Sequence, residues 1–326
     1  MNDLNSPSRR RALRWLSGAP WFPLSTTALA SLGACATTGC GGSGANLTSV
    51  RFVGMAAPNL NNPAAMATMS VGSQLVAQYD DGSSRGFNLG YEPFFTTGDM
   101  VADGKGGQIL AGGYLDINNQ PIMDRSVAGK VRQFFSDAPD GMSLLKLPVT
   151  NVGGIKGNPV FAVVQFEYTT RDNAGASAYG LLPSPIAVLT LDQDPATGKL
   201  TLMKYHNVDT SSVQGLWITC GASLSPWNTH LSSEEYEPDA TVASNAQLKG
   251  FSKALYGDEN TANPYHYGHM PEVTVHPDGT GSIRKHYAMG RISHELVQVM
   301  PDRRTVLMGD DATNGGAFLF IADREA

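Results

Sequence analysis

The chain has 326 residues and a net charge of -6. Four arginines, at positions 9, 10, 11 and 14, against Asp3 give the first 34 residues a local charge of +3, so the remainder carries -9. This acidic body argues against nucleic-acid binding and suits a protein that collects metal cations. With 36 glycines, 19 prolines and only 16% charged residues, long helices are disfavoured. Beyond residue 35 no apolar run approaches the roughly 18 residues of a membrane-spanning helix.

Residues 1–34 are predicted to be a Tat-type signal peptide. The run Ser8-Arg9-Arg10-Arg11 precedes a mildly apolar stretch over 21–30, which is the pattern that the twin-arginine export machinery reads. An ordinary secretory signal is the alternative. Cleavage is expected either after Ala30 or before Cys35, where residues 32–35 resemble a lipobox and Cys35 would carry a lipid anchor. The protein is therefore expected in the periplasm or outside the cell, either free or as a membrane-anchored lipoprotein.

Residues 35–48 are predicted to be a flexible tether, and residues 49–326 an all-β domain. Hairpins are expected over 73–89, 185–205, 272–286 and 297–308, because short β-rich runs alternate there with Gly, Pro, Asn and Asp turns. Such regular spacing fits a sandwich, a barrel or a β-propeller, and the similar layout of the hairpins favours the propeller. Short helices are expected at 127–136 and 244–256. The apolar strand over 317–322 lies close to the last residue, so the propeller is expected to be incomplete, as in a truncated chain.

Cys220 is the lone cysteine of the body, which excludes a disulfide framework. It is either a small buried hydrophobe or a metal-ligating thiolate. Small residues at 221–223, which allow close backbone approach, and the acids Glu234 and Glu235 follow within a few positions. Sulfur together with oxygen suits iron, and paired carboxylates suit calcium. Both roles of Cys220 remain open on these residues alone.

Further acids stand at the ends of predicted strands, where propeller blades line a central site. They are Glu272, Glu295, Asp310 and Asp311. Each by itself is more often a turn or surface residue. No Gly-x-Ser-x-Gly elbow, His-Glu-x-x-His motif, phosphate loop or zinc spacing of cysteines occurs, so the familiar hydrolase signatures are absent.

The chain resembles the PhoX-type alkaline phosphatases, which are twin-arginine exported, metal-dependent β-propeller enzymes. The resemblance rests on several segments in a fixed order: Cys220, Pro226-Trp227-Asn228-Thr229, Glu234-Glu235, Tyr267-Gly268 before Glu272, Gly290 to Glu295, Val306 to Asp311 and, upstream, Val163 to Thr169. It departs from the family pattern at Phe166, where a histidine is usual, and at Ser233, where a cysteine is common. The family's Arg-Pro-Glu segment, which supplies a phosphate-binding arginine, would lie after residue 326.

The resemblance implies ferric iron and calcium ions in a cluster on the propeller axis. It implies that Cys220 and Glu235 bind iron and that Glu272 binds in the same cluster. It further implies calcium-binding or supporting roles for the other acids in the matching segments, namely Glu167, Glu234, Glu295, Asp310 and Asp311. The implied activity is metal-assisted hydrolysis of phosphate monoesters. The alternatives are a non-catalytic metal-binding propeller of the same family, and a calcium-dependent propeller hydrolase of another type, in which Cys220 has no role.

Overall fold

The structure is a computed structural model that describes residues 45–57, 59–62, 64, 70–242 and 245–325. The chain divides into two compact units, Met1–Glu92 and Pro93–Ala326. The predicted signal peptide, the predicted lipid-anchor residue Cys35 and most of the predicted tether lie outside the described residues. In the part of the chain that the structure describes, no helix has the length and apolar character needed to cross a membrane.

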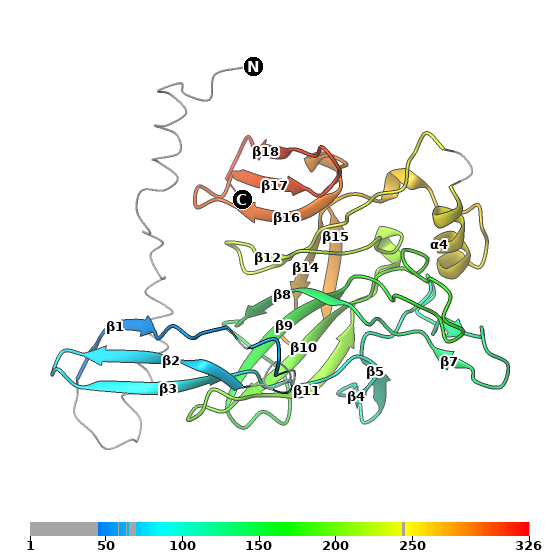
Figure 1. The fold of residues 1–326 in the computed structure, drawn as a ribbon. Helices are drawn as coiled ribbons and strands as arrows, with labels where there is room; N and C mark the ends of the chain where they lie inside the picture. The colour runs from blue at the N-terminus through cyan, green and yellow to red at the C-terminus, as the bar shows by residue number, and fades with distance from the viewer. Residues whose placement is uncertain (1–44, 58, 63, 65–69, 243–244, 326) are drawn as a thin grey trace. The chain divides into compact units, whose positions relative to one another are not determined.

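The first unit contains a three-stranded antiparallel sheet in the order β1-β2-β3 (Figure 1). Its strands are β1 (Leu47–Phe52), β2 (Ser70–Tyr79) and β3 (Ser84–Gly90). The predicted hairpin over 73–89 is confirmed, and Gly82 closes its turn with a φ of 81°, a conformation that glycine adopts without steric cost. One face carries an apolar row in which Phe52 pairs with Leu75 and Leu75 pairs with Phe87.

The second unit is built from antiparallel sheets whose neighbouring strands are consecutive in sequence. Two sheets have four strands and one has three, in the orders β11-β10-β9-β8, β12-β13-β14-β15 and β16-β17-β18. The strands are β4 (Met100–Ala102), β5 (Gln108–Leu110), β6 (Met123–Asp124), β7 (Arg132–Gln133), β8 (Pro139–Leu145), β9 (Asn158–Phe166), β10 (Ile186–Gln193), β11 (Leu200–Asn207), β12 (Ser223–Leu224), β13 (His230–Leu231), β14 (Pro271–Val275), β15 (Gly281–Lys285), β16 (His294–Val299), β17 (Thr305–Asp310) and β18 (Ala317–Ile321).

The sheet of β8 to β11 forms the centre of the second unit. Strands β9 and β10 read as almost continuous apolar runs, and both of their faces are buried, as this pattern predicts. On one face Val163 and Val188 pack with Leu216 and Val273, while the other face buries Leu189 in a separate cluster. This double burial fixes the ends of β8 and β9, from which two of the site residues described below project.

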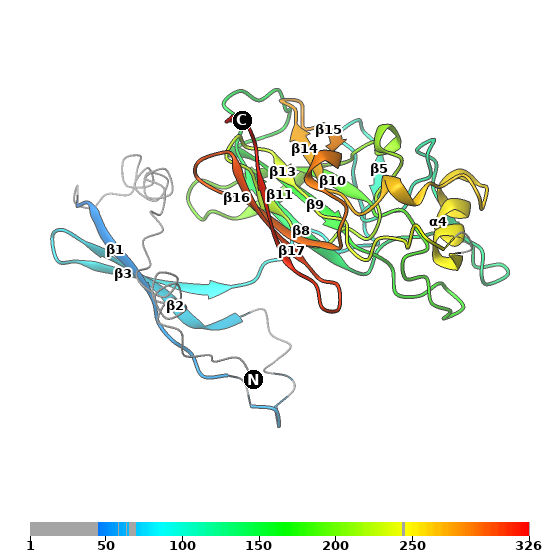
Figure 2. The same ribbon diagram turned by 90° about the horizontal axis from the view of Figure 1, so that it is seen from above.

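The two later sheets share a further apolar cluster. Leu231 of β13 and Met270 pack there with Val297 and Met308 of β16 and β17. Figure 2 shows helix α4 (Ala246–Tyr256) at a side of the unit away from β16 and β17. The side chain of Asn245 caps this helix at its N-terminus by accepting a hydrogen bond from the amide of Leu248. Short 3₁₀ helices occupy Ser211–Val213, Pro264–His266 and Tyr287–Met289.

The all-β prediction is confirmed, and the sheets have the up-and-down form of propeller blades. The other three predicted hairpins are confirmed as β10 with β11, β14 with β15 and β16 with β17, and the predicted strand over 317–322 is confirmed as β18. The predicted helix at 244–256 is confirmed as α4. The predicted helix at 127–136 is wrong, because Gly129 has a φ of 74°, outside the helical region, and β7 in this segment pairs with β6.

Burial of β10 on both faces generates a stability prediction. We expect Leu189→Ala to lower the free energy of unfolding by about 2–5 kcal/mol, because Leu189 is fully buried and its removal leaves a cavity. Leu319→Ala is the matched control, because Leu319 of β18 is 56% exposed and should change stability by less than about 0.5 kcal/mol. Urea denaturation followed by fluorescence measures both. Equal losses in the two variants would contradict the placement of β10 in the core.

Candidate metal centre

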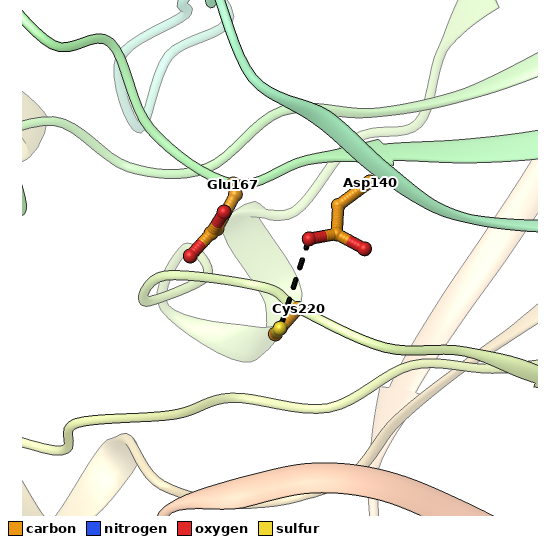
Figure 3. Close-up of side chains that lie close together, drawn as sticks. All are labelled: Asp140, Glu167 and Cys220. Atoms are coloured by element: carbon orange, nitrogen blue, oxygen red, sulfur yellow. Dashed lines mark hydrogen bonds between the residues drawn. The ribbon is translucent and has the colours of Figure 1, made fainter. Parts of the chain in front are cut away.

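The thiol of Cys220 lies among four carboxylates, those of Asp140, Glu167, Glu235 and Glu295. We call these five residues the thiol-carboxylate cluster. Ligand atoms of Asp140, Glu167 and Cys220 lie within 4.8 Å of one another, and so do those of Cys220, Glu235 and Glu295. The Cys220 Sγ atom is 3.3 Å from Glu295 Oε2 and 3.7 Å from Asp140 Oδ2. Figure 3 shows Asp140 and Glu167 beside the cysteine, with the contact between Cys220 and Asp140 dashed.

Five separate segments of the second unit supply these side chains. Asp140 lies near the start of β8, Glu167 directly follows β9, and Cys220 precedes β12. Glu235 lies in the loop after β13, and Glu295 is the second residue of β16. The pairing of β16 with β17 is irregular between His294 and Val297, and such irregularities redirect side chains near sites. The site is therefore a product of tertiary structure rather than of one motif.

Two glycines allow the backbone segments of the cluster to approach closely. A Cβ atom at Gly141 would lie 2.7 Å from the carbonyl oxygen of Cys220, and one at Gly221 would lie 2.4 Å from the carbonyl oxygen of Glu295. Both distances are far inside van der Waals contact, so a side chain at either position would push these segments apart. The amide of Gly141 donates a hydrogen bond of 3.2 Å to the Cys220 carbonyl. The expectation that small residues after Cys220 serve close backbone approach is confirmed at Gly221.

Backbone hydrogen bonds join the segment that carries Glu235 to the segments of Ile218 and His294. The amide of Glu235 donates to the carbonyl of Ile218, and the amide of His294 donates to the carbonyl of Glu234. The hydroxyl of Ser233 contacts the carbonyl oxygens of Gly221 and Glu295 at 2.8 and 3.1 Å. A hydroxyl therefore joins the Cys220 and Glu295 segments where a cysteine is common in the family.

Three acids of the cluster, Asp140, Glu167 and Glu235, have raised pKa values. Burial and hydrogen bonding with the carboxyls of Glu167 and Glu295 raise the pKa of Glu235 to about 9. Burial also raises the pKa values of Glu167 and Asp140, and nearby acids add to both shifts. Burial first, and then the charges of Glu235 and Asp140, raise the pKa of the Cys220 thiol. Like charges in a desolvated site disfavour ionisation, which is the pattern that an added cation reverses.

No cation among the described residues balances this cluster. None of the ion pairs that the structure shows in its described part involves Asp140, Glu167, Glu235 or Glu295. Solvent exposure increases from one end of the cluster to the other. Glu235 is 2% and Cys220 is 9% exposed. Glu167 and Glu295 are partly buried, and Asp140 is exposed. The cluster therefore opens to solvent on the side of Asp140, while Glu235 and Cys220 form its closed end.

The structure places Glu234 outside the cluster. Its carboxylate accepts hydrogen bonds from the amides of Trp217 and His269 and pairs with Lys285 at 2.9 Å. The side chains of Glu234 and Lys285 are both fully buried. Each carboxylate oxygen already has a backbone donor, so Glu234 fastens its segment to the fold and leaves Glu235 to face the cluster.

Glu272 also lies outside the cluster, although the family resemblance implies a ligand there. One of its oxygens accepts from the indole of Trp227 at 2.7 Å and the hydroxyl of Thr229 at 2.5 Å. The other contacts Arg284 at 2.6 Å and His286 at 2.7 Å. Burial alone would raise the pKa of Glu272, but the bonds from His286, Thr229, Trp227 and Arg284 outweigh it and lower the pKa to about 2. This carboxylate therefore has protein cations beside it, and its metal-binding role stays a prediction.

Asp310 and Asp311 are not brought into the cluster either. The carboxylate of Asp310 accepts from the amides of Ala312 and Gly316 and closes the turn after β17. The carboxylate of Asp311 accepts a hydrogen bond from the hydroxyl of Tyr236. Tyr236 follows Glu235 and has a φ of 47°, an uncommon conformation for a bulky residue. Asp311 thus supports the backbone beside Glu235 rather than the cluster itself.

The cluster includes one residue that sequence reasoning missed, Asp140. It stands in Pro139-Asp140-Gly141, a composition typical of a turn, so no local signal distinguishes it from a turn aspartate. The structure places this run at the start of β8 instead, beside Cys220. Of the sequence-predicted residues, Cys220, Glu167, Glu235 and Glu295 are brought together. The polar surroundings of Cys220 also differ from those of a cysteine that serves only as a core hydrophobe.

One comparison with known proteins, that with family models, agrees with the resemblance that the sequence shows. The family model of alkaline phosphatase PhoX matches residues 187–326, which include Cys220, Glu235 and Glu295. No match was found among curated proteins. Among solved structures, the chain is similar to Pseudomonas fluorescens PhoX in complex with vanadate, a transition state analogue, with 18% identity and a TM-score of 0.39. That match covers 72% of this chain and 50% of the other, so the chain spans half the length of that protein. The similarity to the alkaline phosphatase PhoX family is therefore shown over residues 187–326.

Proposed function

We propose that this protein is an exported, metal-dependent phosphomonoesterase whose thiol-carboxylate cluster binds iron and calcium. The observation that carries the proposal is the meeting of Cys220 with four carboxylates from separate elements, without a balancing cation among the described residues. The family match over residues 187–326 supports the phosphatase activity. Export by the twin-arginine route is proposed from Arg9 and Arg10, and attachment of lipid at Cys35 remains a prediction.

The donor set fits the proposed metals. A thiolate is a soft ligand that suits iron, while carboxylates suit both iron and calcium. A bound multivalent cation would stabilise the ionised form of the carboxyls whose pKa values are raised. Cation binding would therefore account for the gathering of so many acids at one place. In the bound state the cations would neutralise the phosphate oxygens of an ester, which is the chemistry that such ions supply in phosphoryl transfer.

The residues of this chain would hold and orient that centre. Glu235 and Cys220, at the closed end, would bind on the side away from water. Asp140 is exposed, so an ester would approach from its side, with the partly buried Glu167 and Glu295 flanking the path. Tyr168 and Tyr179 pack edge to face, with ring centroids 4.8 Å apart. The charge of Glu167 and burial raise the pKa of Tyr168, while burial and then the charges of Glu235 and Glu167 raise that of Tyr179. These rings lie near the cluster and would limit access of water there.

A non-catalytic metal-binding propeller is the second candidate function. One observation favours it: within the described ranges, no arginine forms an ion pair with a cluster carboxylate. A calcium-dependent hydrolase of another type is disfavoured by the placement of Cys220. A cation bound by Cys220 and Glu295 would contact sulfur, which calcium rarely accepts.

Metal analysis of the purified protein and its Cys220→Ser variant tests the proposal. We expect iron together with calcium in the parent, and loss of iron and of p-nitrophenyl phosphate hydrolysis in the variant, because serine keeps the size but removes the soft donor. Circular dichroism checks that the variant is folded. Metal without hydrolysis in the parent would favour the non-catalytic candidate. Calcium alone, or unchanged iron in the variant, would contradict the assignment of Cys220.

Two glutamates of similar burial give a second prediction. We expect Glu235→Gln to lose at least about tenfold in metal affinity, because it removes a carboxylate from the cluster. We expect Glu272→Gln to retain the metal but to unfold more easily, because Arg284 and His286 lose their anionic partner. Metal content and urea denaturation of both variants decide the matter. Loss of metal in Glu272→Gln at normal stability would restore Glu272 to the ligand set.

The pKa of Glu235 gives a prediction for the metal-free protein. Because this pKa rises from 4.5 to about 9 on folding, the folded state holds a proton that the unfolded state releases between these values. The stability of the metal-free protein should therefore decrease as pH rises from about 5 through 9. Urea midpoints in chelator at pH 5, 7 and 9 measure this trend, which Glu235→Gln should flatten. Stability that increases over the same range would contradict the predicted protonation of Glu235.

A further inference from the structure

Three buried polar side chains connect β8 to the backbone of Cys220, and the proposed function does not use them. The Nδ1 atom of His230 lies 2.9 Å from Ser143 Oγ, and its Nε2 atom lies 3.0 Å from Gln165 Oε1. The Nε2 group of Gln165 contacts the carbonyl oxygens of Cys220 and Gly221. Gln165 and His230 are fully buried, and Ser143 is 4% exposed.

The direction of each hydrogen bond among these three side chains follows from the contacts of Gln165 with the backbone. The carbonyl oxygens of Cys220 and Gly221 can only accept, so the NH₂ group of Gln165 must face them. The Oε1 atom of Gln165 then faces His230 and can only accept, so the Nε2 atom of His230 carries its hydrogen.

His230 is neutral at neutral pH, because burial lowers its pKa to about 3. Its Nδ1 atom is therefore an acceptor, and the hydroxyl of Ser143 must donate to it. The opposite arrangement would turn the amide of Gln165 over and place its oxygen against two carbonyl oxygens. Three carbonyl oxygens that face one another in a buried place repel one another, which is strongly unfavourable.

We propose that Ser143, His230 and Gln165 form a positioning relay that fixes the backbone of Cys220 and so holds its thiol towards the carboxylates. The Cys220 carbonyl accepts from Gln165 and from the amide of Gly141, so its position is set from two sides. The inference rests on the proposed function for its consequence, metal binding. The relay itself is a property of the metal-free protein.

The relay is expected to influence the metal through geometry. Groups that orient a metal ligand typically change metal affinity by about 10- to 100-fold when they are removed. The relay joins four backbone segments, on β8, β9, β13 and the residues before β12, so each donor depends on its neighbour. Loss of a middle member leaves the groups on both sides unsatisfied.

The tautomer of His230 is the direct test of the relay. In protein labelled with ¹⁵N-histidine, long-range ¹H–¹⁵N correlation spectra should show His230 with a protonated Nε2 atom and an unprotonated Nδ1 atom at neutral pH. A His230→Gln variant identifies the signals by their loss. A His230 ring protonated at Nδ1, or at both nitrogens, would overturn the proposal, whether or not the protein binds metal.

The Gln165→Met variant tests the effect on Cys220, with Cys35 and Cys40 replaced by Ser in every protein compared. Methionine keeps a similar size but donates no hydrogen bond, so we expect the alkylation rate of metal-free Cys220 by iodoacetamide to change at least about tenfold. We also expect Co²⁺ affinity, followed by the thiolate charge-transfer band, to fall at least about tenfold. Val163→Ala is the matched control, because Val163 lies on the same face of β9 but packs in the apolar cluster.

These measurements separate the relay from the metal site. If the parent binds no Co²⁺, the proposed function fails, and the alkylation rate and the tautomer still decide the relay. If Gln165→Met does not fold, Ser143→Ala replaces it, since this variant removes only the first donor and should shift both readouts in the same direction by less. Rates and affinities equal to those of Val163→Ala would overturn the proposal.

Discussion

Repulsion among the carboxylates around Cys220 is the constraint on which the rest of the site depends. Burial and neighbouring acids disfavour the ionisation of Asp140, Glu167 and Glu235, so these groups do not form a stable set of carboxylates by their own interactions. The fold brings them together by other means. Apolar burial on both faces of β9 and β10 and backbone contacts around Cys220 supply the stability that the cluster lacks.

Close backbone approach is the second part of the same arrangement. Gly141 and Gly221 let the segments of Asp140, Cys220 and Glu295 lie nearer to one another than any side chain would allow. Ser233 then donates a hydrogen bond to the carbonyl groups of Gly221 and Glu295, and Gln165 of the proposed relay donates to that of Cys220. The carbonyl groups of Cys220, Gly221 and Glu295 thus have protein donors, while none of the ion pairs in the described part of the chain involves a cluster carboxylate.

The contrast between Glu235 and Glu272 shows how surroundings decide the role of an acid. Both side chains are buried, but Glu272 has Arg284 and His286 beside it and a pKa of about 2, whereas Glu235 has other acids beside it and a pKa of about 9. A carboxylate that is already paired has little to gain from a metal ion. One that is surrounded by acids gains a partner only when a cation arrives.

The sequence by itself determined the hairpins and the all-β class, because alternating apolar residues and turn residues are local signals. It also singled out Cys220, Glu167, Glu235 and Glu295 through their family segments. Only the tertiary structure added Asp140, which looks like a turn residue, and placed Glu234 and Glu272 beside protein cations. The reason is physical: a ligand set depends on which side chains meet in space and on which charges already neutralise them, and neither is a property of a short segment.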